Sequence, residues 1–334
     1  MPPGDMWSTY RVAAVQSTPV FLDRDATVEK TCSLIARAAG EGARLIAFPE
    51  VWIPGYPVWL SGAPSAVLWG HEPARKAFRR LVANAITIPS ADVTRIGAAA
   101  RAANAYVVIG VHELSGGTLY CSQLFFGPTG ELLGVHRKLK PTYDERLIWG
   151  QGDGDGLIVL DTELGKLGGL LCWEHWMPLT RQAMHEQTEL LHVASWPDVN
   201  ETHQIASRHY AFEGRTFVLA VGTVLRKRDL PTDLELLREI PGEPDDLIQR
   251  GGTAIIGPDG EYLAGPVWDE EAIITTEIDP GLAVEERLTF DAAGHYNRPD
   301  VFNFRVNRGP RHVAETEVVE ARAANERGVS VSGD

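Results

Sequence analysis

Short apolar runs alternate with longer amphipathic stretches along most of this 334-residue chain, and this alternation constrains the fold more than any other feature. Residues 11–16 and 44–48 have the composition of buried strands, and the stretch between them has helical periodicity after Asp23, a suitable N-cap. The same reasoning predicts helices at 74–81, 91–103, 178–187 and 201–214, and strands at 106–111, 167–171, 190–195 and 216–224. Strands interleaved with helices indicate an α/β protein whose helices cover mixed sheets.

Two segments share one turn pattern. Phe126-Gly127-Pro128-Thr129-Gly130-Glu131 resembles Ile256-Gly257-Pro258-Asp259-Gly260-Glu261, and each hexapeptide is followed by a further apolar run. The pattern predicts two equivalent β-hairpins, the first with strands at 119–126 and 132–137. The alternative is two unrelated turns that use the same Pro and Gly chemistry.

The elements follow one another without a long linker, which predicts a single domain over residues 1–309. Residues 226–250 are charged and contain prolines, so we expect a surface excursion there. Residues 310–334 lack sustained periodicity and are expected to form a C-terminal tail. Either segment could instead contact another subunit, and the sequence does not separate these alternatives.

The charge balance argues against several partners. The chain has 31 basic and 45 acidic residues, a formal net charge of −14, which gives no broad attraction to nucleic acid or to an anionic membrane. No stretch approaches the roughly 18 apolar residues of a membrane span, and the N-terminus has no signal-peptide pattern. We therefore expect a cytoplasmic protein with small or neutral partners.

The chain has three cysteines at wide spacing, Cys32, Cys121 and Cys172, which argues against a disulfide framework and against a thiolate zinc site. Cys32 and Cys121 are interpreted as core residues. Cys172 follows the apolar run 167–171 at a predicted strand-to-helix junction, where backbone N–H groups can point at a reacting group. The sequence leaves open whether Cys172 is a nucleophile or another core residue.

Two residues could accept a proton from the Cys172 thiol. His175 is close in sequence, although sequence proximity is a poor guide to geometry. Glu50 ends a predicted strand in the apolar context Phe48-Pro49-Glu50-Val51-Trp52, where burying a carboxylate is costly. Glu50 could equally be a capping or ion-paired acid.

Four separated motifs can be compared with known families: Phe48-Pro49-Glu50, Arg137-Lys138-Leu139-Lys140-Pro141-Thr142, Cys172-Trp173-Glu174 and Gly294-His295-Tyr296-Asn297-Arg298-Pro299-Asp300-Val301-Phe302. In this order and spacing they resemble the nitrilase branch of the carbon–nitrogen hydrolase superfamily, over residues 11–307. The resemblance implies an α-β-β-α sandwich of the nitrilase type, in which two mixed sheets are flanked by helices.

The resemblance also implies roles for individual residues. Glu50 matches the general base, Lys138 the catalytic lysine and Cys172 the nucleophile, while Glu145 matches a second glutamate that positions lysine and substrate. Lys138 is preferred because it matches the first lysine of its motif. Lys140 would share its face in a strand, so periodicity alone does not choose between the two lysines.

The implied activity is that of a nitrilase, which converts an organic nitrile to a carboxylic acid and ammonia through a thioimidate and a thioester on the cysteine. Neither a metal nor an organic cofactor is expected. A backbone N–H near Trp173 is expected to assist at the substrate nitrogen. Tyr56, His175, Trp176 and Trp196 are expected to wall an apolar pocket, which favours an aromatic or arylaliphatic nitrile.

Several alternatives remain at this level. A cyanide dihydratase or an amidase could use the same Glu-Lys-Cys site, and a non-catalytic binding or scaffold protein is the alternative of another class. The expected partners are a small nitrile and water, with no nucleic acid and no membrane. The resemblance further implies a homodimer or a larger spiral homo-oligomer, with residues 52–71 and 226–250 as contact segments.

Overall fold

In the computed structural model, which describes residues 8–309, the strands form two mixed sheets. The first has the order β13 (Ala272–Ile278), β1 (Tyr10–Gln16), β2 (Ala43–Ala47), β3 (Tyr106–Ser115), β4 (Thr118–Phe126) and β5 (Leu132–Arg137). The second has the order β10 (Val224–Arg226), β11 (Leu247–Ile256), β9 (Phe217–Val221), β8 (Leu191–Ser195), β7 (Gly165–Leu171) and β6 (Val159–Thr162), and β12 (Tyr262–Trp268) pairs with β11. At the centre of each sheet three strands run parallel, β1 to β3 and β7 to β9.

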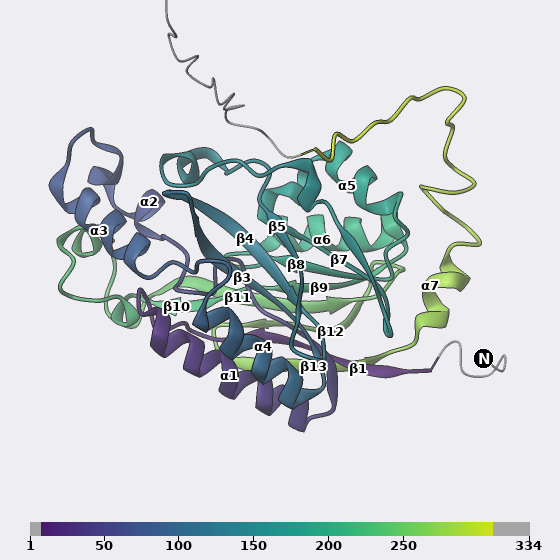
Figure 1. Cartoon of the computed structure of the whole chain (residues 1–334), viewed down its shortest axis with the longest axis horizontal. Coiled ribbons are helices and arrows are strands. Elements are labelled where there is room, and N and C mark those ends of the chain that lie inside the picture. Colours follow the sequence, from purple (N-terminus) through teal and green to yellow (C-terminus); the bar gives the residue numbers. More distant parts are fainter. Residues whose placement is uncertain (1–7, 310–334) are drawn as a thin grey trace, which may run out of the picture.

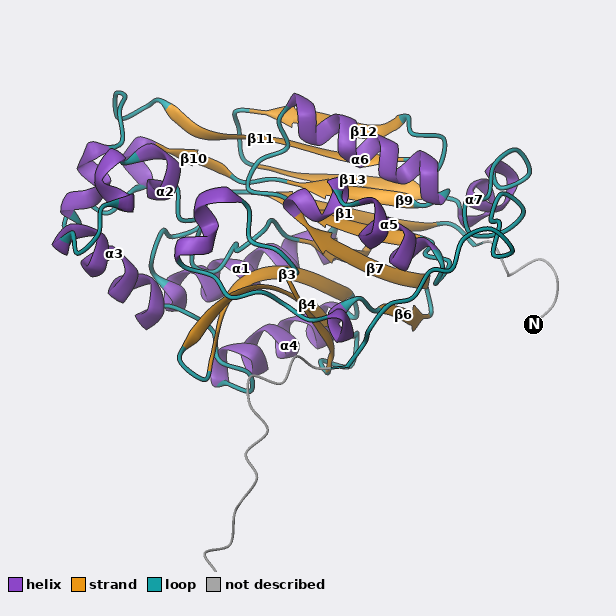
Figure 2. Ribbon diagram, turned by 90° about the horizontal axis from the view of Figure 1, so that it is seen from above, coloured by secondary structure: helices purple, strands orange, loops and turns teal. Residues whose placement is uncertain are grey.

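Helices cover the outer face of each sheet (Figures 1 and 2). The α-helices are α1 (Arg24–Gly40), α2 (Trp59–Gly62), α3 (Glu72–Ala83), α4 (Ala91–Ala103), α5 (Pro178–His185), α6 (Glu201–Gly214) and α7 (Pro280–Glu286). The 3-10 helices are η1 (Pro64–Val67), η2 (Tyr143–Leu147), η3 (Gly154–Gly156), η4 (Cys172–Trp176), η5 (Lys227–Asp229) and η6 (Glu235–Glu239).

Three apolar clusters hold these layers together. One joins α1 and α4 to the first sheet, the second lies between the sheets, and the third joins α5 and α6 to the second sheet. Strand β1 shows how the sequence builds two of them, because Val12 and Ala14 face the other sheet while Ala13 and Val15 face the helices. The predicted α-β-β-α sandwich is confirmed.

The two predicted hairpins are equivalent. In the β4–β5 turn the Gly127 N–H donates to the Glu131 carbonyl at 2.9 Å, and in the β11–β12 turn the Gly257 N–H donates to the Glu261 carbonyl at 2.8 Å. Each hairpin follows three parallel strands connected by helices, so the two halves of the chain have closely similar element order.

Two expectations need correction. The predicted strand 216–224 is interrupted, because Thr223 donates from its backbone N–H to Pro197 and so separates β9 from β10. Residues 226–250 are more than a surface excursion, since Leu236 and Leu237 are buried in an apolar cluster with Trp59 and Leu81 of α2 and α3. Figure 1 shows this segment beside α2 and α3, with which it forms a side lobe.

Within residues 8–309, no helix is both long and apolar enough to span a membrane. The predicted tail, residues 310–334, lies outside the described residues. The boundary proposed near residue 309 therefore stays a prediction.

Candidate active site

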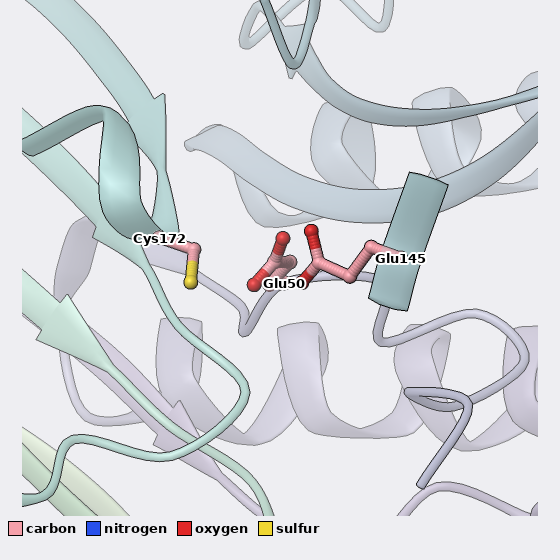
Figure 3. A group of neighbouring side chains, drawn as sticks. All are labelled: Glu50, Glu145 and Cys172. Atoms are coloured by element: carbon pink, nitrogen blue, oxygen red, sulfur yellow. The ribbon is translucent and has the colours of Figure 1, made fainter. Parts of the chain in front are cut away.

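Four reactive side chains converge from separate parts of the chain. Glu50 lies three residues after β2, Lys138 directly follows β5, Cys172 directly follows β7, and Glu145 lies in η2. One carboxylate oxygen of each glutamate and the Sγ atom of Cys172 lie within 4.8 Å of one another. Figure 3 shows Glu50 between Cys172 and Glu145. The ends of strands from both sheets thus build one site.

The Lys138 ammonium lies between two carboxylates. Its Nζ atom donates to Glu50 Oε1 and to Glu145 Oε2, at 2.7 Å in each case, and all three side chains are buried. Burial alone would lower the pKa of Lys138, but the negative charges of Glu50 and Glu145, and of Cys172 when its thiol is ionised, raise that pKa well above its usual value. Lys138 is therefore a buried cation at neutral pH.

Burial also distinguishes the two lysines that periodicity could not. Strand β5 ends at Arg137, so Lys138 and Lys140 do not share a strand face, and Lys140 is exposed.

The two glutamates and Cys172 have the atom types of a metal site. The Lys138 ammonium already bonds both carboxylates, however, and the expectation of no metal stays a prediction.

Close backbone packing fixes Glu50. A Cβ atom on Gly110 of β3 would lie 2.4 Å from both the Pro49 carbonyl oxygen and the Val51 nitrogen, so only glycine lets this loop approach β3. Burial, partly offset by the charge of Lys138, raises the pKa of Glu50 to about 7. Glu50 Oε1 is occupied by Lys138, whereas Oε2 is buried and makes no hydrogen bond. This free oxygen is suited to accept a proton.

Cys172 begins η4 in a strained conformation. Its φ is 50°, in the left-handed region, which costs a non-glycine residue roughly 1–3 kcal/mol and is common at functional sites. Burial raises the pKa of its thiol well above the usual value, while Lys138 and the backbone N–H of Trp173 favour the thiolate. The resting group is a thiol, next to a cation that stabilises its anion.

Similar strain occurs beside two other site residues. Val51, next to Glu50, has a φ of 38°, and Tyr143, two residues before Glu145, has a φ of 42°. A positive φ is unfavourable for valine in particular, because its Cβ is branched. The surrounding packing must hold these loops in place.

Cys121 has a contact that the sequence did not suggest. The side chain is buried as expected, but its Sγ donates to Glu50 Oε1 at 3.2 Å, across 71 residues of sequence. Its carbonyl also accepts a bond from the Lys138 N–H at 2.8 Å. Cys121 therefore packs against the site and helps to hold two of its members.

Glu174 ties the nucleophile segment to the lysine segment. Its carboxylate accepts from the backbone N–H groups of Leu171 and Leu139, at 2.8 and 2.7 Å, and from His136 Nε2 at 2.8 Å. His136 Nδ1 donates to the Gly156 carbonyl at 3.0 Å, so this histidine donates from both nitrogens and is protonated. Burial opposes this charge, yet Glu174 raises the pKa of His136, and Glu174 has its own pKa lowered.

His175 is turned away from the Cys172 thiol. Its Nδ1 atom lies 2.6 Å from the Cys172 carbonyl oxygen, to which it must donate, and Nε2 bonds His192. With both nitrogens engaged, His175 has no free ring nitrogen to take the thiol proton, which favours Glu50 of the two candidates, and its place in a pocket wall stays a prediction. Trp196 is completely buried and stacks on His175 and on His203, with its indole N–H bonded to Ser207.

The remaining pocket candidates have different environments. Tyr56 is half-buried and its hydroxyl donates to Glu145 Oε1 at 2.8 Å, so it touches the site directly. Trp173 and Trp176 are exposed, at 52% and 40% of their surface. The C-terminal motif lies against α5, where Asn297 Nδ2 donates to Glu186 Oε1 at 2.9 Å, and does not reach the four-residue cluster.

Comparison with known proteins first defines the class. The family model described as carbon-nitrogen hydrolase matches residues 11–287. Among solved structures, Saccharomyces cerevisiae Nit3, a member of branch 10 of the nitrilase superfamily, shares the fold with a TM-score of 0.66 and 18% identity. That match covers 87% of this chain and 97% of the yeast protein.

Curated relatives narrow the class. Nitrilase 1 of Arabidopsis thaliana is 42% identical over 91% of this chain and 88% of its own length. The bifunctional nitrilase/nitrile hydratase NIT4 of Oryza sativa subsp. japonica is 42% identical over 91% of this chain and 85% of its own length. The chain belongs to the nitrilase branch of the carbon–nitrogen hydrolase family.

Proposed function

We propose that this protein is a nitrilase in which Cys172 is the nucleophile, Glu50 the general base and Lys138 the electrostatic catalyst. The observation that carries the proposal is the buried cluster in which Lys138 bonds Glu50 Oε1, Glu50 Oε2 makes no hydrogen bond, and one Glu50 carboxylate oxygen lies within 4.8 Å of the Cys172 sulfur. Curated relatives that are 42% and 41% identical to this chain are named as nitrilases, which supports nitrile hydrolysis as the reaction.

In the first half of the reaction Glu50 takes the Cys172 proton as sulfur attacks the nitrile carbon. A carbon–sulfur bond forms, the triple bond becomes a double bond, and the proton passes to nitrogen to give a thioimidate. Lys138, together with the Trp173 N–H, stabilises the negative charge that develops on the nitrogen. Glu145 holds the lysine in place, and Tyr56 in turn holds Glu145.

In the second half Glu50 activates water, which adds to the thioimidate carbon. Breaking the carbon–nitrogen bond releases ammonia and leaves a thioester, which a second water hydrolyses to the carboxylic acid. Breaking the carbon–sulfur bond instead releases an amide. The rice relative is named for both reactions, so acid and amide should be measured together.

The preferred substrate class is an aromatic or arylaliphatic nitrile, supported by the aromatic residues Tyr56 and Trp173 beside the cluster. The test measures ammonia, acid and amide from phenylacetonitrile, mandelonitrile, benzonitrile and an aliphatic dinitrile. Hydrolysis of at least one aryl nitrile is expected, and no product from any nitrile by folded protein with an intact thiol would reject the proposal. Cyanide or an amide as the best substrate would favour the two enzyme alternatives.

Activity should fall as the pH drops through about 7, because Glu50 has its pKa raised to about 7 by burial and its protonated form cannot accept the thiol proton.

Cys121→Ala removes a hydrogen bond that favours the Glu50 carboxylate, so the acid limb of kcat/KM should move to higher pH. Cys32→Ala, a change in α1, is the matched control and should leave the limb in place. An acid limb that is identical in all three proteins would contradict this role of Cys121.

We expect the protein to form at least a homodimer. Exposed apolar side chains gather on η4, α5 and α6, namely Trp176, Leu179, Ile205 and Phe212, and a surface of this kind is typical of a subunit contact. The fully exposed Trp69 in the side lobe could support further growth into a spiral. Light scattering at micromolar concentration should give a mass above one chain, and a single monomer mass would exclude this assembly.

The proposed location is the cytoplasm. Cys32, Cys121 and Cys172 are all unpaired, which suits a reducing compartment. Fractionation of the source cells, with detection of the protein, would test this assignment.

A further inference from the structure

A buried hydrogen-bonded chain begins at the backbone of the nucleophile. His175 Nδ1 bonds the Cys172 carbonyl oxygen at 2.6 Å, His175 Nε2 lies 3.0 Å from His192 Nε2, and His192 Nδ1 lies 3.0 Å from Glu189 Oε1. The hydroxyl of Tyr210 donates to Glu189 Oε2 at 2.5 Å and closes the chain. All these side chains are buried, and none belongs to the proposed catalytic cluster.

Two neutral histidines and a carboxylate carry one proton fewer than the contacts of this hydrogen-bonded chain require. A carbonyl oxygen only accepts, so His175 Nδ1 must donate. Each of the next two contacts, His175 to His192 and His192 to Glu189, also needs a proton between its atoms. Two neutral imidazoles supply only two of the three protons that these contacts need. The hydrogen-bonded chain must therefore hold one further proton.

The surroundings show where that proton resides. Burial lowers the pKa of both histidines well below the usual value, and burial raises the pKa of Glu189 to about 7. A Cβ atom on Gly168 of β7 would lie 1.8 Å from Glu189 Oε1, so the glycine leaves room for this carboxyl group. Below pH 7 the chain thus consists of two neutral histidines and a carboxylic acid.

Other titratable groups are arranged around the chain. They are Arg181 and His185 of α5, His203 and Glu213 of α6, His136 of β5, Glu174 of η4 and Arg287 after α7. Glu213 pairs with Arg181 and His185, and its pKa is lowered to about 2 by those partners against the effect of burial. Glu213 therefore keeps its charge in the range where Glu189 titrates.

We propose that His175, His192 and Glu189 are positioning residues that hold the nucleophile segment η4 through one shared proton, and that loss of this proton at alkaline pH lowers activity. Removing the proton leaves two lone pairs facing each other in the chain, and the bond that supports the strained Cys172 backbone weakens. The acid limb of the activity profile belongs to Glu50, and the alkaline limb belongs to this chain.

Glu189→Gln tests the proposal, because an amide presents an N–H to His192 and an oxygen to Tyr210 and cannot lose its proton in this range. The variant should follow the acid limb of the wild type but lose the alkaline decline, or move it up by about one pH unit or more. Tyr210→Phe removes a bond that favours the carboxylate, so its alkaline limb should also move up. Glu186→Gln, which changes an exposed side chain directly after α5, is the control and should keep the wild-type limb.

The activity readout rests on the proposed nitrilase function, so a second readout is independent of it. A folded-state pKa of about 7 against an ordinary value of 4.5 means that the stability Glu189 contributes is present at acid pH and lost as pH rises through 7. The Tm of Glu189→Gln relative to wild type should therefore increase between about pH 4.5 and pH 7 and level off above that range. The proposal would be overturned if both variants kept the alkaline limb of the wild type and the Tm difference between Glu189→Gln and wild type did not change with pH. If Glu189→Gln does not fold, the alkaline limb of Tyr210→Phe decides. Inactivity of the wild type on every nitrile would reject the nitrilase function but leave the Tm test standing.

Discussion

Replacing Cys172 by alanine is expected to lower nitrile hydrolysis by at least about 1,000-fold, because no other group can form the covalent intermediate. The side chain is small and buried, and alanine fills most of its volume, so the fold should persist. Initial rates of ammonia release, measured with Tm on the same preparations, separate loss of chemistry from loss of structure.

The other cysteines provide the controls for that result. Cys121→Ala should retain measurable turnover with a shifted acid limb, and Cys32→Ala should behave as wild type. Each of the three variants loses one thiol, so a difference in activity between them reports which cysteine was replaced and not how many thiols remain. Substantial activity in a folded Cys172→Ala protein would contradict the assignment of the nucleophile and revive the alternative of a binding or scaffold protein.

Lys138→Met should reduce both activity and stability. Methionine occupies similar space without charge, so Glu50 and Glu145 would face each other without a cation. Removing one partner of a buried ion pair costs about 3–5 kcal/mol, and protonation of a carboxylate relieves part of that cost. Loss of an electrostatic donor alone lowers kcat by roughly 100-fold, and a protonated Glu50 would lower it further.

A double variant separates the two effects. In Lys138→Met with Glu145→Gln one of the two facing charges is gone, so much of the stability should return while activity stays low. Lys140→Met is the control because Lys140 is exposed, and it should change neither quantity appreciably. Equal loss of activity in Lys138→Met and Lys140→Met would contradict the choice of Lys138.

Much of the fold could be predicted from local patterns. The alternation of strands and helices and the repeated Pro-Gly turn both concern residues close in sequence, where backbone preferences act directly. Strand β13 was harder to predict, because it has no regular alternation of buried and exposed residues and is held by pairing with β1, more than 250 residues away. The side lobe depends in the same way on contacts between distant segments.

The residues of the site likewise differ in how far local sequence patterns predict them. Glu50 and Cys172 stand out because polar residues that end apolar strands gather at sheet ends. Lys138 needed the family resemblance, since only the fold shows that it is buried and Lys140 is not. The contacts of Cys121 and Glu174 join residues 71 and 35 positions apart, and no local pattern contains that information.

The most direct test of the central claim is the mass of the protein quenched during turnover of an aryl nitrile. We predict an adduct on the peptide that contains Cys172, heavier by the mass of the nitrile for the thioimidate, or by the corresponding acyl group for the thioester. Cys172→Ala should carry neither adduct, whereas Cys121→Ala should carry them. An adduct on another residue, or turnover of substrate without any covalent species under conditions that trap thioesters, would contradict the account.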